Sequence, residues 1–224
     1  MTSTLARGAA AELLGTFFLV AAVIGSGIAA QRLSPTDPGL QLLENSIATG
    51  AILIALILAL QPVSASFNPV ITLVERIRGD TTTGTAAALV AAQLTGAVLG
   101  AVVANVMFEL DPVSVSTHVR GGNGQLLGEV VATLGLVIVV FGALRSARAE
   151  TVAFAVGGYI AAGYWFTSST SFANPAVTIA RMFSDTFAGI APASAPGFIL
   201  MQLIGASIGG ALIVLLHPRT QEAT

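Results

Sequence analysis

The chain has no cysteine and no lysine, and charged residues make up only 9% of its 224 residues. The absence of cysteine excludes a disulfide, a thiolate nucleophile and a cysteine-ligated metal. All nine basic residues are arginines, the net charge is −2, and like charges do not cluster, so nucleic-acid binding has no electrostatic basis. The two histidines, His118 and His217, lie far apart in polar segments. We therefore expect no cofactor, no metal site and no nucleic-acid partner.

The rest of the chain is mostly apolar. Hydrophobic residues make up 54% of the chain and the mean hydropathy is +0.87, whereas a soluble domain carries roughly 25% charged residues. Most of the long apolar segments reach the roughly 20 residues that a helix needs to cross a bilayer. The composition therefore predicts an all-α, multi-pass membrane protein. The segments are residues 9–30, 42–61, 84–107, 125–144, 152–166, which is short, and 196–216.

Three sequence landmarks occur twice in the same order, once in residues 9–107 and once in residues 125–216. Each half contains three apolar segments, and an odd number of spans gives the two halves opposite orientations in the membrane. We therefore predict a single membrane domain, residues 1–224, built from two inverted repeats. The landmarks are a Glu with a Thr four residues later (Glu12 and Glu129), an Asn-Pro pair (Asn68-Pro69 and Asn174-Pro175), and a Gln-x-x-Gly-x-x-x-Gly pattern (Gln93 and Gln202).

The two Asn-Pro pairs are predicted helix starts. Asparagine is a favoured N-cap, and proline suits the first helical position because it has no N–H to leave unpaired. The segments that follow, residues 70–76 and 176–183, are too short to span a bilayer. Each pair therefore indicates a half-helix entered from a loop that dips into the membrane, a feature that marks solute sites in inverted-repeat membrane proteins.

Arginine placement predicts the orientation of the chain. If both termini are cytoplasmic, six arginines lie inside and three outside, in keeping with the positive-inside tendency. The inside residues would be Arg7, Arg76, Arg78, Arg145, Arg148 and Arg219, and the outside residues Arg32, Arg120 and Arg181.

The doubled Asn-Pro-Val/Ala motif, the paired glutamates and the paired Gln-x-x-Gly motifs resemble the aquaporin or major intrinsic protein family over residues 9–216. The resemblance implies six transmembrane helices and two re-entrant half-helices, a homotetramer in the lipid bilayer of a bacterial plasma membrane, and passive permeation without catalysis. It implies a pore centre at Asn68, Pro69, Val70, Asn174, Pro175 and Ala176, with the asparagine NH₂ groups directed into the pore.

Four polar residues of this pattern are expected to be structural. In the family, the glutamates matching Glu12 and Glu129 accept hydrogen bonds from the re-entrant loops, although a proton path is the alternative for any carboxylate within a span. Gln93 and Gln202 are expected to form hydrogen bonds between helices.

The main departure from the family pattern is Val177. Water-selective members carry an arginine at this position, where it narrows the pore. The other selectivity-filter positions fall on Ser171 and near Thr49 and Ala162, so we expect a wide, uncharged constriction. Arg181, four residues beyond Val177, has two interpretations: it faces the outer vestibule, or it anchors the half-helix and pairs with Asp185.

These features favour a passive channel for small neutral solutes: glycerol-like polyols, water, and undissociated arsenous acid as a further candidate. The Asn-Pro-Ala-Val sequence also resembles a bacterial branch of the family linked to arsenite movement. A water-selective channel is the first alternative. Two further alternatives are less favoured. A coupled secondary transporter would need a carboxylate or cation site near the midplane, and an intramembrane enzyme would need a nucleophile with a base or metal ligands. The apolar segments offer neither.

Overall fold

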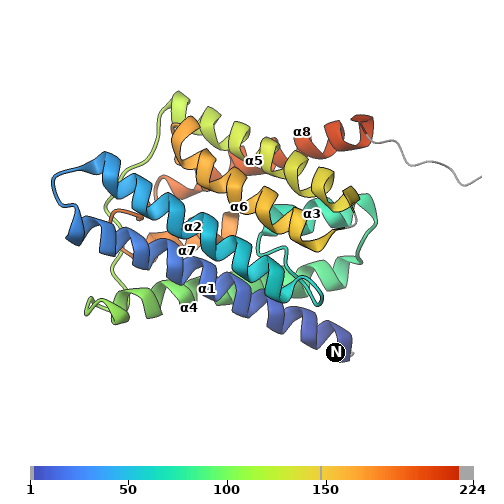
Figure 1. Cartoon of the computed structure of the whole chain (residues 1–224), viewed down its shortest axis with the longest axis horizontal. Helices are drawn as coiled ribbons and strands as arrows, with labels where there is room; N and C mark the ends of the chain where they lie inside the picture. The colour runs from blue at the N-terminus through green and yellow to red at the C-terminus, as the bar shows by residue number, and fades with distance from the viewer. Residues whose placement is uncertain (1–2, 147, 217–224) are drawn as a thin grey trace, which may run out of the picture.

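The computed structural model describes residues 3–146 and 148–216, so His217 and Arg219 lie outside the described part. In this part the chain forms only helices and loops (Figure 1). The long helices are α1 (Ser3–Leu33), α2 (Pro38–Leu60), α4 (Thr83–Met107), α5 (Asn123–Ala143), α6 (Ala149–Phe166) and α8 (Ala195–Leu216). The short elements are α3 (Pro69–Arg78), α7 (Pro175–Ala180) and the 3₁₀ turns η1 (Leu144–Ser146) and η2 (Arg181–Phe183).

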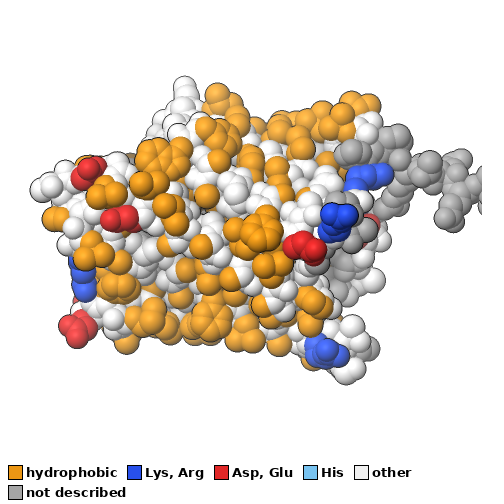
Figure 2. All heavy atoms as spheres, viewed as in Figure 1, with side chains coloured by type: hydrophobic (Ala, Val, Ile, Leu, Met, Phe, Trp, Pro, Cys, Tyr) orange, Lys and Arg blue, Asp and Glu red, His pale blue; other side chains and the backbone are white. Residues whose placement is uncertain are grey.

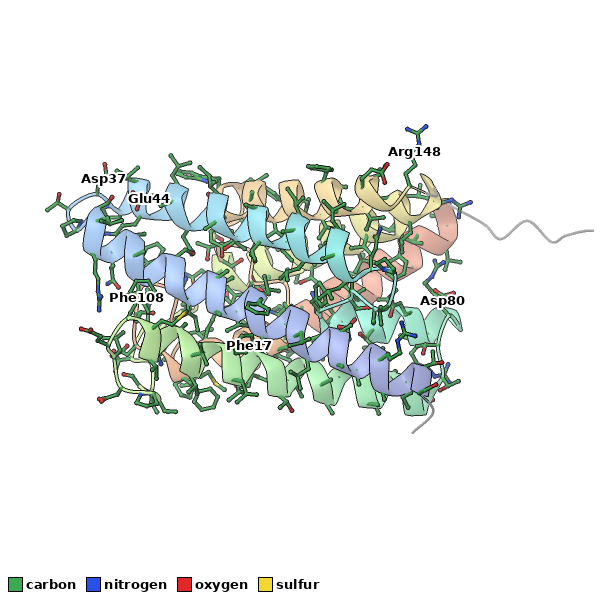
Figure 3. All side chains as sticks on the ribbon, turned by 60° about the horizontal axis from the view of Figure 1, so that its bottom comes forward. Phe17, Asp37, Glu44, Asp80, Phe108 and Arg148 are labelled. Carbon is green, nitrogen blue, oxygen red and sulfur yellow. The ribbon has the colours of Figure 1, made fainter. Side chains whose placement is uncertain are left out.

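The six long helices form one bundle, and its surface suits a bilayer. Of these helices, α1, α2, α4, α5 and α8 are long and apolar enough to cross a membrane. The sixth, α6, has 18 residues, including Glu150 in its first turn, and packs against α2 and α5. Apolar side chains cover the middle of the visible face, and charged ones gather toward its two ends (Figure 2). Figure 3 shows Asp37 and Glu44 at one end, and Asp80 and Arg148 at the other.

Helix contacts follow the same plan in both halves of the chain. Helix α1 packs on α2 and α4, and α5 packs on α6 and α8. The half-helices exchange partners, since α3 and α7 each contact both α4 and α8. The first and last described residues lie at the same end of the bundle (Figure 1). We call this the inner end and the opposite one the outer end.

Glycines allow the closest helix contacts. A Cβ atom on Gly96 of α4 would lie 2.2 Å from the carbonyl oxygen of Leu13 on α1, and one on Gly205 of α8 would lie 2.5 Å from that of Val130 on α5. Real side chains do not approach a backbone so closely. These positions therefore hold each pair of helices at a separation that only glycine permits.

Candidate functional site

The two half-helices begin at the predicted asparagines. Asn68 Oδ1 accepts from the backbone N–H of Val70 at 3.1 Å, and Asn174 Oδ1 accepts from those of Ala176 and Val177 at 2.9 and 3.3 Å. Proline follows each cap at the first helical position. The local sequence alone accounts for these helix starts.

The N-terminal ends of α3 and α7 meet each other. Asn68 Nδ2 donates to the carbonyl oxygen of Ala173, and Asn174 Nδ2 donates to that of Phe67, both at 2.8 Å. Phe67 and Ala173 have φ angles of 46° and 48°, in the left-handed region that residues other than glycine rarely adopt. This unusual backbone brings each carbonyl within reach of the opposite asparagine. One N–H of each amide is thus used, which leaves the second for a solute.

Two buried glutamates hold the loops that lead into this joint. Glu12 accepts from the backbone N–H of Ser66 and Phe67 at 2.8 and 2.7 Å. Glu129 accepts from those of Phe172 and Ala173, both at 3.0 Å. Both glutamate side chains are fully buried. Each carboxylate therefore satisfies two backbone donors that no helix can pair.

Two buried glutamines link the glutamates to the half-helices. Gln93 Nε2 donates to Glu12 at 2.7 Å and to the Thr72 hydroxyl of α3 at 3.0 Å. In the second half, Gln202 Nε2 donates to Glu129 at 2.6 Å and to Thr178 of α7 at 2.9 Å. Each half-helix is thereby tied to two long helices.

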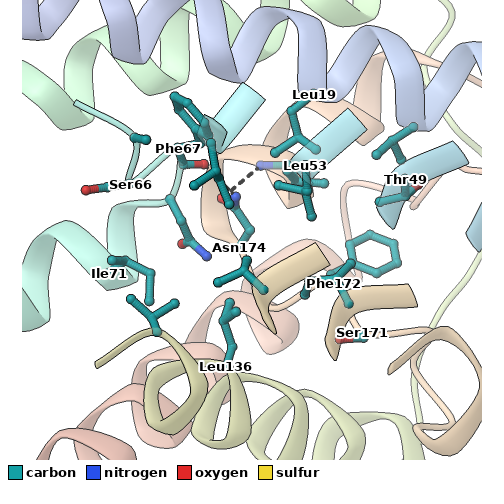
Figure 4. A pocket seen from close by; sticks show the side chains of 18 of the residues that line it. Leu19, Thr49, Leu53, Ser66, Phe67, Ile71, Leu136, Ser171, Phe172 and Asn174 are labelled. Atoms are coloured by element: carbon teal, nitrogen blue, oxygen red, sulfur yellow. Dashed lines mark hydrogen bonds between the residues drawn. The ribbon is translucent and has the colours of Figure 1, made fainter. Parts of the chain in front are cut away.

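A cavity of about 80 Å³ runs past the joint (Figure 4). The residues of the long helices that line the cavity recur every four positions. Residues four apart lie on the same side of a helix. In α6 these residues extend from Val152 to Tyr164, about 18 Å along the helix axis at 1.5 Å per residue. Lining side chains include Leu19 and Val23 of α1, Thr49, Leu53 and Ile57 of α2, Leu136 and Val140 of α5, and Val152, Val156, Ile160 and Tyr164 of α6.

Of the predicted pore-centre residues, Asn68 and Asn174 line this cavity. Figure 4 shows the Asn174 amide bonded to Phe67 beside the cavity. The side chains of Val70 and Ala176 are fully buried in the core instead. The two carbons by which the Val70 side chain exceeds that of alanine therefore do not enter the cavity. Pro69 and Pro175 serve as the first residues of their helices.

Hydroxyl groups gather on the outer part of the cavity wall. The hydroxyls of Thr49 and Tyr164 lie 3.0 Å apart and share a hydrogen bond. Ser171 is 3% exposed, and within the described residues its Oγ has no hydrogen-bond partner. Val177 lines the same region. The cavity wall at this level therefore combines apolar carbon with several hydroxyls.

Ala162 does not belong to this wall, contrary to our prediction. It is exposed on the outside of the bundle. Two residues along a helix correspond to a turn of about 200°, so Ala162 faces away from the side that presents Ile160 and Tyr164. The recurrence of Val152, Val156, Ile160 and Tyr164 every four residues is the sequence signal that identifies Tyr164 as the lining residue.

Arg181 lines the outer end of the cavity and is only 2% exposed. Its Nε donates to the carbonyl oxygen of Ala188. Asp185, the alternative partner considered from the sequence, accepts from the backbone and hydroxyl of Thr117 at 2.8 and 3.1 Å. Burial lowers the pKa of His118 in the neighbouring loop, the positive charges of Arg120 and Arg181 lower it further, and the charge of Asp185 opposes them.

Comparisons with known proteins point to one family. The family model described as major intrinsic protein matches residues 1–152. Aquaglyceroporin AqpS of Rhizobium meliloti (strain 1021) is 50% identical over 216 residues, which is 96% of this chain and 92% of that protein. The X-ray structure of the aquaglyceroporin from Plasmodium falciparum has the same fold, with a TM-score of 0.71, 16% identity and 96% of each chain covered.

Proposed function

Because this chain belongs to the major intrinsic protein family, whose members are membrane channels, we propose that it conducts glycerol-sized polyols and water passively, with undissociated arsenous acid as a further solute. The observation that carries this proposal is the outer constriction. Val177 occupies the place of the arginine that water-selective members carry, and the hydroxyls of Thr49, Tyr164 and Ser171 lie on the same part of the wall.

The cavity wall suits a polyol, which has an apolar carbon chain with hydroxyls along it. Apolar side chains such as Leu53 and Ile160 face the cavity together with the amides of Asn68 and Asn174. Aliphatic residues accept the carbon chain, while the second N–H of each amide is available to a passing hydroxyl. Arsenous acid is neutral at pH 7 and offers a similar set of hydroxyls, and one similar relative is named an aquaglyceroporin.

Ions are expected to be excluded at the joint. The N-terminal ends of α3 and α7 carry positive dipole ends, which oppose a cation. A hydrated ion would also find few groups to replace its water in a wall made mostly of carbon, and a charge at the bilayer centre costs roughly 3 kcal/mol even on insertion scales. Neutral solutes avoid both penalties.

We further propose that residues 9–107 and 125–216 are inverted repeats, with both termini cytoplasmic in a bacterial cell membrane. Two observations support the repeat. Each half-helix contacts a long helix of the other half, α3 with α8 and α7 with α4, and Glu12 and Glu129 accept hydrogen bonds from equivalent backbone N–H groups. Apolar residues such as Phe18 and Phe154, 50% and 59% exposed, offer surface both to lipid and to neighbouring subunits of the expected homotetramer.

Flux measurements in liposomes test this function. Purified protein should accelerate swelling of vesicles in glycerol and shrinkage in sucrose, followed by light scattering in a stopped-flow instrument, and should admit arsenous acid down its gradient. Passive flux is independent of a proton or sodium gradient. Uptake that requires either gradient would instead identify a coupled transporter, and shrinkage in sucrose without glycerol entry would identify a water-selective channel.

A further inference from the structure

Two buried arginines from different loops converge on one aromatic ring at the outer end of the cavity. Arg120 belongs to the loop between α4 and α5, and Arg181 begins η2; they are 9% and 2% exposed. Their Cζ atoms lie 5.1 and 3.5 Å from the centroid of the Phe172 ring. Phe172 lines the cavity next to Ser171 (Figure 4). The ring face attracts cations, so Phe172 holds both guanidinium groups beside the cavity.

A short loop supplies the remaining contacts of the two guanidinium groups. Arg120 donates to the carbonyl oxygens of Phe187 and Gly189 at 3.1 and 2.8 Å, and Arg181 donates to that of Ala188, which lies between them. Three consecutive carbonyls therefore point at the two arginines. Gly189 permits this conformation, because a Cβ atom there would lie 2.3 Å from Ser116 Oγ.

The positive charge of this cluster is not neutralised by a direct ion pair. Within residues 3–146 and 148–216, neither guanidinium forms a salt bridge. Glu129 attracts both arginines from a distance, but its oxygens accept from Phe172, Ala173 and Gln202. Carbonyl groups carry no net charge, and the single charge of Glu129 offsets at most one of the two arginines, so a net positive field remains at the cavity.

Arg181 also has hydrogen-bond donors that are not used by the described residues. Only its Nε forms a hydrogen bond among the described residues, and the side chain lines the cavity. The terminal nitrogens Nη1 and Nη2 are therefore free to meet ions and solutes that enter from the outer end. Burial lowers the pKa of Arg120, which lies outside the spanning helices, to about 10, so this residue stays charged at neutral pH.

We propose that Arg181, supported by Arg120 and positioned by Phe172, forms an outer cation barrier of this channel in addition to the one at the joint. The inference rests on the proposed channel function. Arg181 follows Val177 by four residues, which at helical rise is about 6 Å along the axis. The barrier thereby lies outside the constriction, whose width is set by Val177. A wide passage for polyols and a high barrier for cations are then compatible, because different residues provide them.

Charge removal at Arg181 is the direct test. Arg181→Gln keeps a donor for the Ala188 carbonyl, and Arg181→Lys keeps the charge. A sodium ion about 6 Å from a unit charge at an effective dielectric constant of about 20 is disfavoured on the order of a hundredfold. We therefore expect Arg181→Gln to raise sodium entry at least about tenfold, while Arg181→Lys stays close to the unmodified channel.

Arg32 provides a matched control. Its Nη2 donates to the Phe108 carbonyl at 2.6 Å, and its Cζ lies 5.3 Å from the Phe108 ring centroid. It thus resembles Arg181 in its contacts but is more exposed and does not line the cavity. Glycerol entry and sodium entry, the latter reported by an enclosed fluorescent indicator, are measured on the same vesicles. Arg32→Gln should change neither flux.

The outcomes separate this inference from the channel function. An unmodified protein that admits no glycerol refutes the channel function itself. Normal glycerol entry with unchanged sodium entry in Arg181→Gln refutes only the barrier, as does an equal sodium leak in Arg181→Lys. If Arg181→Gln loses glycerol entry through misfolding, sodium entry is measured in Arg120→Gln instead. A rise in sodium entry supports the barrier, and unchanged sodium entry refutes it.

Discussion

Replacement of Val177 by arginine tests the proposal that the outer part of the cavity is a constriction whose width Val177 sets. Val177 lies on α7, its side chain lines the cavity and it is only 5% exposed. An arginine side chain has four more non-hydrogen atoms than valine and adds a positive charge one helical turn before Arg181. The change therefore restores the residue that water-selective members of the family carry, in a protein that already has an arginine further out.

The expected effect follows from the size of the cavity. A water molecule needs at least roughly 10–15 Å³, so a cavity of about 80 Å³ holds only a few water molecules. Four added atoms, each similar in size to a water oxygen, take up a large part of this space. Glycerol has six non-hydrogen atoms and would have to displace packed side chains, at about 1–3 kcal/mol. We expect Val177→Arg to reduce glycerol permeability about tenfold or more and water permeability less than about threefold.

Stopped-flow light scattering measures both permeabilities on one preparation of vesicles. Val177→Leu, which adds one carbon and no charge, is the matched control and should lower glycerol entry only slightly. Val177→Arg with Arg181→Gln separates size from repulsion between the two arginines, because it leaves one charge in place. Unchanged glycerol entry in Val177→Arg would refute the placement of the constriction, and equal loss of both permeabilities would indicate misfolding.

Other predictions concern the frame around the cavity. Asn174→Ala removes a helix cap and the bond to Phe67, so it should lower the free energy of unfolding by about 1–2 kcal/mol, measured as a lower melting temperature in detergent, and should reduce glycerol entry. Glu129→Gln places an NH₂ group or a weaker acceptor against backbone donors and should destabilise the protein by about 1–3 kcal/mol; the same change at the exposed Glu150 should have a smaller effect, roughly 0.3–1 kcal/mol, because this charge lies in the first turn of α6. Gly96→Ala forces a Cβ against a backbone carbonyl 2.2 Å away and should disrupt the contact between α1 and α4, whereas Gly158→Ala, with open space around it, should leave the melting temperature unchanged or raise it.

The sequence predicted the helices and the starts of the half-helices well, because local chemistry determines them. Asparagine caps and prolines place the starts of α3 and α7 at Pro69 and Pro175. Apolar length located the long helices to within a few residues at most ends, although α1 starts six residues before its apolar segment, at Ser3 rather than Ala9. Small and polar residues outside the apolar run continue this helix, which hydropathy does not detect.

The wall of the cavity was harder to predict, because it depends on how each helix is rotated in the bundle. The orientation of α6 is fixed by its contact with α2, where a Cβ on Gly157 would lie 2.6 Å from the carbonyl oxygen of Gly50. This contact turns Tyr164 inward and Ala162 outward. Alignment by motif spacing cannot detect such a rotation, and the lengths between motifs differ in the two halves. The contacts of Arg120 were also not predicted, since its partners lie 52 or more residues away along the chain.

The strained backbone at the joint explains why buried residues outside the cavity wall should still govern conduction. Phe67 and Ala173 have positive φ angles, a conformation that costs roughly 1–3 kcal/mol per residue. Each N–H donates to a buried glutamate and each carbonyl accepts from the opposite asparagine. A hydrogen bond to a charged group contributes about 1.5–3 kcal/mol, which is enough to offset this strain. Loss of a glutamate bond would let its loop relax and shift the partner asparagine, so a variant at Glu12 or Glu129 that still folds should conduct poorly although neither residue lines the cavity.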